Sequence, residues 1–260
     1  TTREIDGVPV TGWFTEDFTL SELKTLRARE RLPQLRPASV AYNGRDEILT
    51  FAEVAAIARE GSVRTGRTIG VYPELKHPAH FIARGLDPES ALVEALKAAG
   101  LTGAQAPVFV QCFEQRPLER LNRRIDNPLI QLMAAEGGPA DRPGATYAAM
   151  ATAEGLRAVA AYADGVGVEK TMVIPRDAQG RSLAPSRFVA DAHAAGLKVH
   201  VWTLRAENYF LALELRRGLA VRPDFMRLHG DLAAEARAFR DAGVDGMFSD
   251  YPGLVVRAVR

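Results

Sequence analysis

The chain has 260 residues, of which 47% are hydrophobic and 25% are charged, an ordinary globular composition with enough length for one large core. Its formal net charge is +1, so no global field favours nucleic acid or an anionic membrane as a partner. The single cysteine, Cys112, excludes an internal disulfide framework and a cysteine-rich metal site. No apolar run approaches the ~20 residues that a membrane helix needs. No signal peptide is visible, and since the chain begins at Thr1 without an initiator methionine, we expect it to be part of a longer sequence.

Residues 1–60 are predicted to form a hairpin followed by two helices. Asp6-Gly7, flanked by apolar residues, is typical of a hairpin turn. Two capping boxes, each a threonine followed three residues later by a glutamate, predict helices at residues 20–29 and 51–60. The intervening residues 30–48 are rich in proline, glycine and asparagine and are predicted to form a loop.

From residue 68 onward, strand and helix patterns alternate. Strands are predicted at 68–75, 108–112, 129–133, 165–168, 197–203 and 244–248, with helices mainly at 88–99, 117–124, 186–195, 232–242 and 252–259. This alternation predicts βαβ units and a parallel sheet. No Gly-x-Gly-x-x-Gly motif follows a strand, which argues against a dinucleotide fold. Six strands leave two possibilities: an open sheet, or an eight-stranded barrel whose first two strands lie upstream of Thr1.

The end of the first of these strands carries an acid and a base. Glu74 and Lys76 are two residues apart, so on a strand they point to the same side at a spacing of about 7 Å, while Leu75 points into apolar packing. The carboxyl end of a parallel strand is where α/β proteins place their chemistry. The alternative is a surface ion pair at a strand end.

Polar and aromatic residues also end the later strands: Gln111, Phe113, Gln131, His200, Trp202 and Asp250. Each has a structural interpretation as well. The two glutamines could satisfy buried backbone groups, the aromatic residues could belong to the core, and the histidine could be buried and hydrogen-bonded. Their convergence at one end of a parallel sheet favours a site.

The cofactor chemistry of these residues stays open at this point. A hard divalent cation usually takes two or three carboxylates, and only Glu74 and Asp250 are good candidates at the strand ends. No histidine or carboxylate cluster suggests zinc. Lys76 could contact a phosphate, or it could form a Schiff base if it were desolvated.

Five segments together resemble one family, the longer bacterial glycerophosphodiester phosphodiesterases. Residues 6–24 resemble the insert region of that family, and residues 73–78 its third barrel strand. Residues 110–113 resemble the Gln-Ser-Phe end of the fourth strand, with Cys112 in place of serine. Residues 201–205 and 248–252 resemble the seventh and eighth strand ends. The resemblance covers the whole chain.

The resemblance implies an α/β fold, a TIM (β/α)8 barrel of the phospholipase-C-like phosphodiesterase type, with about six of its eight strands in this chain. Residues 1–260 would form a single barrel domain, in which 1–60 are the insert and 68–260 supply strands three to eight. The implied reaction is hydrolysis of a glycerophosphodiester to an alcohol and sn-glycerol 3-phosphate with Ca²⁺ or Mg²⁺.

By the same resemblance, Glu74 is a metal ligand, Lys76 and Gln111 bind substrate, and Phe113 and Trp202 form the wall of the glycerol pocket. The family's acid–base histidines precede Thr1 in this alignment, and none of the five histidines here matches them. We therefore expect no catalysis from this chain alone. The family branch implies a periplasmic or secreted protein.

Two other functions remain open from the sequence: a lysine-dependent aldolase-like barrel acting through Lys76, and a non-catalytic barrel that binds phosphodiesters. The expected partner is a small-molecule glycerophosphodiester, with no nucleic acid and no membrane span. The sequence does not define the head group, the choice between Ca²⁺ and Mg²⁺, or the oligomeric state.

Overall fold

The computed structural model describes residues 1–260 and divides into two compact units. The first unit contains residues 1–109 together with 125–127, and the second contains 110–124 together with 128–260. The single barrel domain stays a prediction.

The first unit begins with the hairpin that the sequence predicts. Strands β1 (Thr2–Ile5) and β2 (Val8–Thr11) pair in antiparallel fashion around Asp6 and Gly7. Both turn residues adopt left-handed backbone angles, with φ of 53° and 78°. Two consecutive residues with positive φ define the turn type that matches the twist of a hairpin, which explains the Asp-Gly pair.

Both predicted capping boxes are confirmed, but the helices differ in length from the prediction. Helix α1 (Leu20–Leu23) stops six residues early, because Leu20 and Leu26 are 59% and 51% exposed and find no apolar surface to pack on. Helix α2 (Phe51–Thr65) runs five residues further than predicted and ends at a left-handed Gly66. Short 3₁₀ turns, η1 (Thr15–Asp17) and η2 (Pro37–Tyr42), connect these elements.

The strand predicted at 68–75 is only partly formed. Val71 makes an isolated parallel bridge to Val108, and β3 itself is limited to Glu74–Leu75. Pro73 lies between them and has no N–H to donate to a ladder, which accounts for the interruption. Helix α3 (Pro78–Ala83), which was not predicted, follows, and then α4 (Pro88–Ala98), which was.

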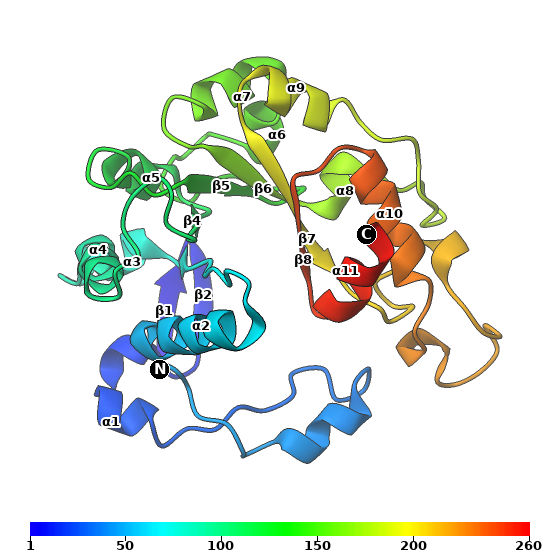
Figure 1. Cartoon of the computed structure of the whole chain (residues 1–260), viewed down its shortest axis with the longest axis horizontal. Helices are drawn as coiled ribbons and strands as arrows, with labels where there is room; N and C mark the ends of the chain where they lie inside the picture. The colour runs from blue at the N-terminus through cyan, green and yellow to red at the C-terminus, as the bar shows by residue number, and fades with distance from the viewer. The chain divides into compact units, whose positions relative to one another are not determined.

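The second unit contains five parallel strands whose spatial order follows the chain (Figure 1). They are β4 (Val110–Cys112), β5 (Leu129–Met133), β6 (Gly165–Glu169), β7 (Lys198–Leu204) and β8 (Gly246–Ser249). The predicted parallel sheet is confirmed for these strands. Neighbouring strands that follow each other in sequence and run parallel are the pattern of a (β/α) barrel.

Helices follow each of these strands along the chain: α5 (Gln115–Leu121), α6 (Tyr147–Met150), α7 (Ala153–Val159), α8 (Lys170–Val173), α9 (Phe188–Ala194), α10 (Leu232–Asp241) and, after the last strand, α11 (Pro252–Val259). Helices α7 and α9 contact each other beside the sheet (Figure 1). Two 3₁₀ turns, η3 (Leu213–Leu215) and η4 (Phe225–Arg227), lie in the long connection between β7 and α10. Gly196 and Gly243 follow the ends of α9 and α10 with left-handed φ of 84° and 89°, the conformation that a helix end favours.

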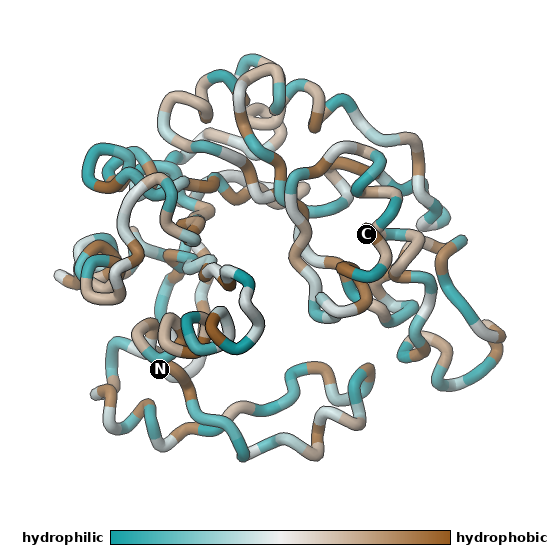
Figure 2. Tube along the Cα trace, viewed as in Figure 1, coloured by the Kyte–Doolittle hydropathy of each residue, from teal (hydrophilic) through white to brown (hydrophobic).

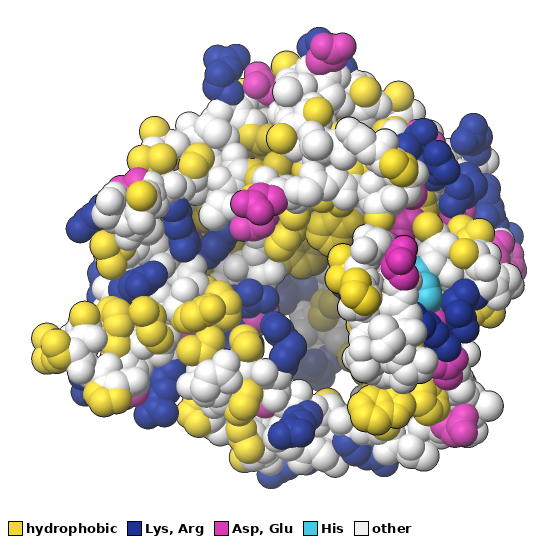
Figure 3. Space-filling model, turned by 180° about the vertical axis from the view of Figure 1, so that it is seen from behind, with side chains coloured by type: hydrophobic (Ala, Val, Ile, Leu, Met, Phe, Trp, Pro, Cys, Tyr) yellow, Lys and Arg dark blue, Asp and Glu magenta, His cyan; other side chains and the backbone are white.

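The core of the second unit lies along its strands. Every residue of β4 and β5 is buried, and the apolar stretches are visible along the trace in Figure 2. Strands that are buried on both faces need helices on one side and packed side chains on the other, as in α/β proteins. On the face that Figure 3 shows, basic and acidic side chains are interspersed. None of the helices is long and apolar enough to cross a membrane.

One close approach between β7 and β8 gives a testable prediction. His200 and Gly246 are register partners, and a methyl group on Gly246 would lie 2.7 Å from the His200 ring. His200 is buried and cannot easily move away. We expect Gly246→Ala to lower the free energy of unfolding by about 1–3 kcal/mol through overpacking. Chemical denaturation measures this change.

The matched control is Gly12→Ala, because Gly12 has open space around its Cβ position and no left-handed φ. Equal stability of the Gly246→Ala and Gly12→Ala proteins would contradict the prediction. In a double mutant, His200→Ala should relieve most of the effect of Gly246→Ala.

Candidate active site

In the first unit, Glu74 and Lys76 lie on the same side of the chain, as the strand pattern predicts. The Lys76 Nζ donates to Glu74 Oε1 at 3.0 Å, and the side chains are 68% and 20% exposed. Leu75 between them is buried. The lysine therefore keeps most of its ammonium group in contact with solvent while the carboxylate is largely covered.

This chain contains few potential metal ligands that lie close to one another. No group of three or more His, Cys, Asp or Glu side chains that could hold a metal ion is found. Glu74 has one carboxylate oxygen that is not used by Lys76, which suits a single ligand to a hard cation. Because the other donors are not assembled here, the residues present do not complete a cation site.

In the second unit, the predicted aromatic residues lie against each other. The Phe113 and Trp202 rings meet edge to face with centroids 5.9 Å apart, and Tyr147 packs on Phe113 from another side. The Trp202 indole donates to the Gly167 carbonyl at 3.0 Å, which fixes its orientation. Gln111 is buried in β4 on the same side of the strand as Phe113.

Gln131 has the structural role that the sequence left as an alternative. Its amide donates to the carbonyls of Cys112, Phe113 and Leu132, and its oxygen accepts a hydrogen bond from the Tyr162 hydroxyl at 2.9 Å. Gln131 is completely buried. With its amide and its oxygen both engaged, this glutamine holds the end of β4 in place rather than facing a ligand.

An ion pair joins the carboxyl ends of β7 and β8. Leu204 and Ser249 are register partners, and the residues that follow them are Arg205 and Asp250. Arg205 Nε donates to Asp250 Oδ2 at 2.9 Å. Asp250, which the sequence offered as a possible cation ligand, is thus already bound to a cation of the protein.

A buried cluster next to β6 was missed by sequence reasoning. Lys170 follows the last residue of β6, and its Nζ donates to Glu235 Oε1 at 2.7 Å and to the Phe210 carbonyl at 3.0 Å. Arg176 donates to the same carbonyl at 2.8 Å. Burial lowers the pKa of Lys170 and raises the pKa of Glu235 despite their mutual attraction. The rule that strand ends carry polar groups could have found Lys170, but its partner on α10 left no signal.

The long connection between β7 and α10, residues 205–231, is closed by Asn208. This completely buried amide donates to the carbonyls of Arg217 and Phe225, both at 2.8 Å, and its oxygen accepts from the Arg217 N–H. Glu207, also buried, accepts a hydrogen bond from the Tyr251 hydroxyl at 2.7 Å. The residues directly after β7 are therefore held by polar contacts on several sides.

The histidines of the chain are engaged in structural contacts. The pairs are His77 with Asp6, His80 with Glu16, His193 with Asp245 and the His229 ring with Tyr251, while His200 is buried in β7. Burial lowers the pKa of His200. The expectation that this histidine is buried is confirmed.

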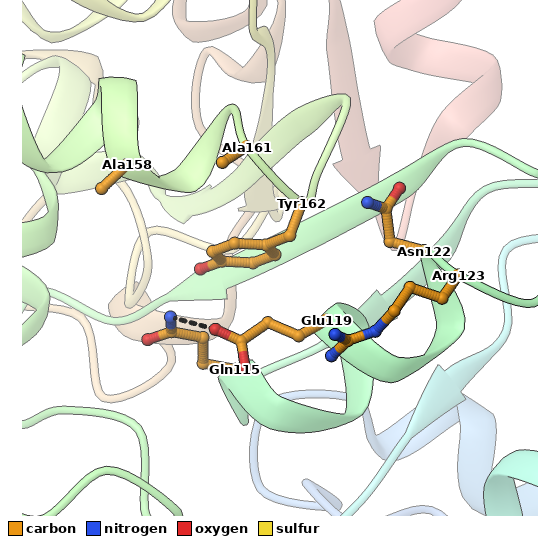
Figure 4. Close-up of a pocket in the computed structure, with 7 residues that line it drawn as sticks. All are labelled: Gln115, Glu119, Asn122, Arg123, Ala158, Ala161 and Tyr162. Carbon is orange, nitrogen blue, oxygen red and sulfur yellow. Dashed lines mark hydrogen bonds between the residues drawn. The ribbon is translucent and has the colours of Figure 1, made fainter.

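A pocket of about 410 Å³ lies in the second unit, and none of the predicted site residues lines it. It is lined by Gln115, Glu119, Asn122, Arg123, Ala158, Ala161 and Tyr162, from α5 and the end of α7 (Figure 4). Gln115 donates to Glu119 one turn further along α5, and Arg142 binds both oxygens of Glu119. The pKa of Tyr162 is raised, mainly because its hydroxyl group is buried.

Parallel strands in chain order, with helical connections and polar strand ends, define an α/β protein of the TIM-barrel type. A solved structure from Silicibacter pomeroyi, assigned as a glycerophosphoryl diester phosphodiesterase, matches 99% of this chain and 74% of its own, with a TM-score of 0.63 and 19% identity. A glycerophosphodiester phosphodiesterase from Parabacteroides distasonis matches 93% of this chain and 70% of its own, with a TM-score of 0.51 and 12% identity. These likenesses show the fold.

The chain belongs to the glycerophosphoryl diester phosphodiesterase family, whose family model matches residues 2–254. A glycerophosphodiester phosphodiesterase of Arabidopsis thaliana is 33% identical over 97% of this chain, which spans 66% of that protein. A glycerophosphodiester phosphodiesterase of Treponema pallidum is 26% identical over 94% of this chain, which spans 71% of that protein. The family resemblance drawn from the strand-end motifs is confirmed.

The buried cluster gives a prediction about stability. Glu235→Ala leaves Lys170 buried at 11% side-chain exposure without its carboxylate, so we expect a loss of about 3–5 kcal/mol in the free energy of unfolding. Glu94→Ala is the control, because its ion pair with Lys97 lies exposed on α4 and should contribute less than about 1 kcal/mol. Urea denaturation of the two variants would refute the prediction if it gave equal losses.

Proposed function

We propose that the protein to which this chain belongs hydrolyses glycerophosphodiesters to an alcohol and sn-glycerol 3-phosphate. The observation that carries the proposal is the Glu74–Lys76 pair at the end of β3, in a chain that the family model matches over residues 2–254. This chain spans about two thirds of the length of the Arabidopsis relative, so the activity is proposed for the whole protein.

In this proposal Lys76 binds a phosphate oxygen of the substrate. Its side chain is 68% exposed, so the ammonium group can leave Glu74 for a ligand at little cost. A positive charge beside the phosphate stabilises the transition state, where negative charge concentrates on the oxygens. Phe113 and Trp202 supply an apolar wall for the carbon skeleton of the glycerol, and Gln111 supplies an amide beside it.

We also propose that the activity depends on a divalent cation, Ca²⁺ or Mg²⁺, with Glu74 as one ligand. Glu74 would be one of several ligands to such a cation, which would supply positive charge next to the phosphate. Acid–base catalysis by histidines remains part of the proposal, and it is not assigned to any of the five histidines described above. A periplasmic or secreted location is proposed from the family branch alone.

The aldolase alternative is less well supported by the geometry. A Schiff-base lysine is activated in a desolvated pocket or beside another cation. Lys76 is mostly exposed and its partner is a carboxylate. A non-catalytic binding protein remains the other alternative, and an activity assay of the full-length protein with glycerophosphocholine decides between it and the enzyme.

The substitution Glu74→Gln tests whether Glu74 is a ligand to a divalent cation. The substitution keeps the size of the side chain but removes its charge, so we expect weaker binding of the divalent ion, measured by calorimetry, and a loss of activity by orders of magnitude. The fold should survive, which circular dichroism checks. Normal activity together with normal sensitivity to a chelator would contradict the role of Glu74.

Substitutions of Lys76 separate the two enzyme readings. For a phosphodiesterase, Lys76→Met should raise KM and lower kcat, because the ammonium acts on both substrate and transition state. Lys76→Arg should keep part of the affinity, since the charge remains although its geometry changes. The measurement is release of sn-glycerol 3-phosphate with and without chelator. Chelator-insensitive protein that borohydride traps covalently at Lys76 would instead establish the aldolase.

A further inference from the structure

Arg205 is a cation at the carboxyl edge of the sheet with part of its hydrogen-bonding capacity unused. A guanidinium carries five N–H donors. The Nε group of Arg205 donates to Asp250, and its two terminal amino groups make no hydrogen bond to the protein. The side chain as a whole is 25% exposed, so Arg205 is partly accessible from solvent.

The direction of the Arg205 side chain is fixed on two sides. Asp250 holds Nε from the end of β8, and the guanidinium carbon lies 4.6 Å from the centre of the Phe210 ring. Phe210 itself is held by its carbonyl, which accepts hydrogen bonds from Lys170 and Arg176. Because both neighbours are anchored, Arg205 can bind a ligand without paying the full entropy of ordering a long side chain.

Arg205 packs beside a second group of charged side chains. The contacts just described join three cations, Arg205, Lys170 and Arg176, to two carboxylates, Asp250 and Glu235. Lys170 and Glu235 are largely buried, so little solvent screens them. The buried charges behind Phe210 are largely paired with one another, and Arg205 is the cation that directly follows the last residue of β7.

The position of Arg205 relates it to the proposed substrate wall. It comes three residues after Trp202 on the same chain segment and directly follows the last residue of β7. The carboxyl ends of parallel strands carry the active-site groups in barrels of this type. Arg205 therefore belongs to the edge of the sheet on which substrate is bound.

We propose that Arg205 binds an oxyanion of the substrate through its two terminal amino groups. The oxyanion is either the phosphate or a carboxylate on the leaving alcohol, since both match the planar fork of a guanidinium. This inference rests on the proposed phosphodiesterase function, and it adds a residue that selects substrates by negative charge.

The experiment compares two substrates in the full-length protein. Glycerophosphoglycerol has an uncharged head group, and glycerophosphoserine has one with a carboxylate. The variants are Arg205→Gln and Arg205→Lys, with Arg222→Gln as matched control because Arg222 also pairs with an aspartate, Asp224, in the same connection. The readouts are kcat/KM for each substrate, the unfolding midpoint, and calorimetric binding of sn-glycerol 3-phosphate and glycerophosphoserine.

We expect Arg205→Gln to lower kcat/KM roughly 10- to 100-fold, the range for a hydrogen-bonded charged group, while Arg222→Gln changes it less than about twofold. An equal loss on both substrates assigns the phosphate, and a loss confined to glycerophosphoserine assigns the head-group carboxylate. Should Arg205→Gln fail to fold, Arg205→Lys decides, because a lysine keeps the charge and loses the fork.

Unchanged kcat/KM and unchanged binding in a folded Arg205 variant would overturn the inference. Absence of phosphodiesterase activity in the unaltered protein would contradict the proposed function instead. In that case the two binding measurements still test whether Arg205 contacts an oxyanion. Weaker binding of either ligand to the Arg205 variant than to Arg222→Gln supports the contact. Equal binding, or no binding by either protein, refutes it.

Discussion

The parallel register of β4 to β8 is the constraint on which the second unit depends. Since each strand pairs with the next in the same direction, all five carboxyl ends lie at one edge of the sheet. That edge gathers Phe113, Lys170, Trp202, Arg205 and Asp250 although they are far apart in the chain. A slip of one residue in any pair would turn the alternating side chains to the wrong face and scatter the group.

Next to this edge, Lys170 and Glu235 form a buried ion pair. Burial lowers the pKa of Lys170 and raises the pKa of Glu235, which favours the uncharged form of each. Removing one partner would leave the other charge buried and unpaired, which is strongly destabilising. The second contact of Lys170, to the Phe210 carbonyl, holds the backbone of the residue on whose ring Arg205 packs. Arg205 thus packs on a residue that is held by a largely buried ion pair.

The sequence predicted the parts of the fold that depend on local rules. β5 and α11 have the predicted bounds, and the Asp6-Gly7 turn follows from the need for positive φ. Where distant packing decides, prediction failed: α1 ends early for lack of a surface to cover, and α3 was missed. At the site, the common side of Glu74 and Lys76 was predictable from the period of a strand, whereas the partners of Lys170 and Arg205 come from other elements and leave no periodic signal.

Asn208 separates the connection after β7 into two parts with different tolerance to change. Hydrogen bonds from its side-chain amide hold residues 217 and 225 together at the base of a loop. The exposed Leu219 and Val221 lie within that loop. The loop between residues 217 and 225 can be lengthened or replaced without moving the end of β7, since the entropic cost of closing a loop grows only slowly with its length. The segment around 219–221 is therefore a place where evolution, or an engineer, can attach new sequence while Arg205 stays where it is.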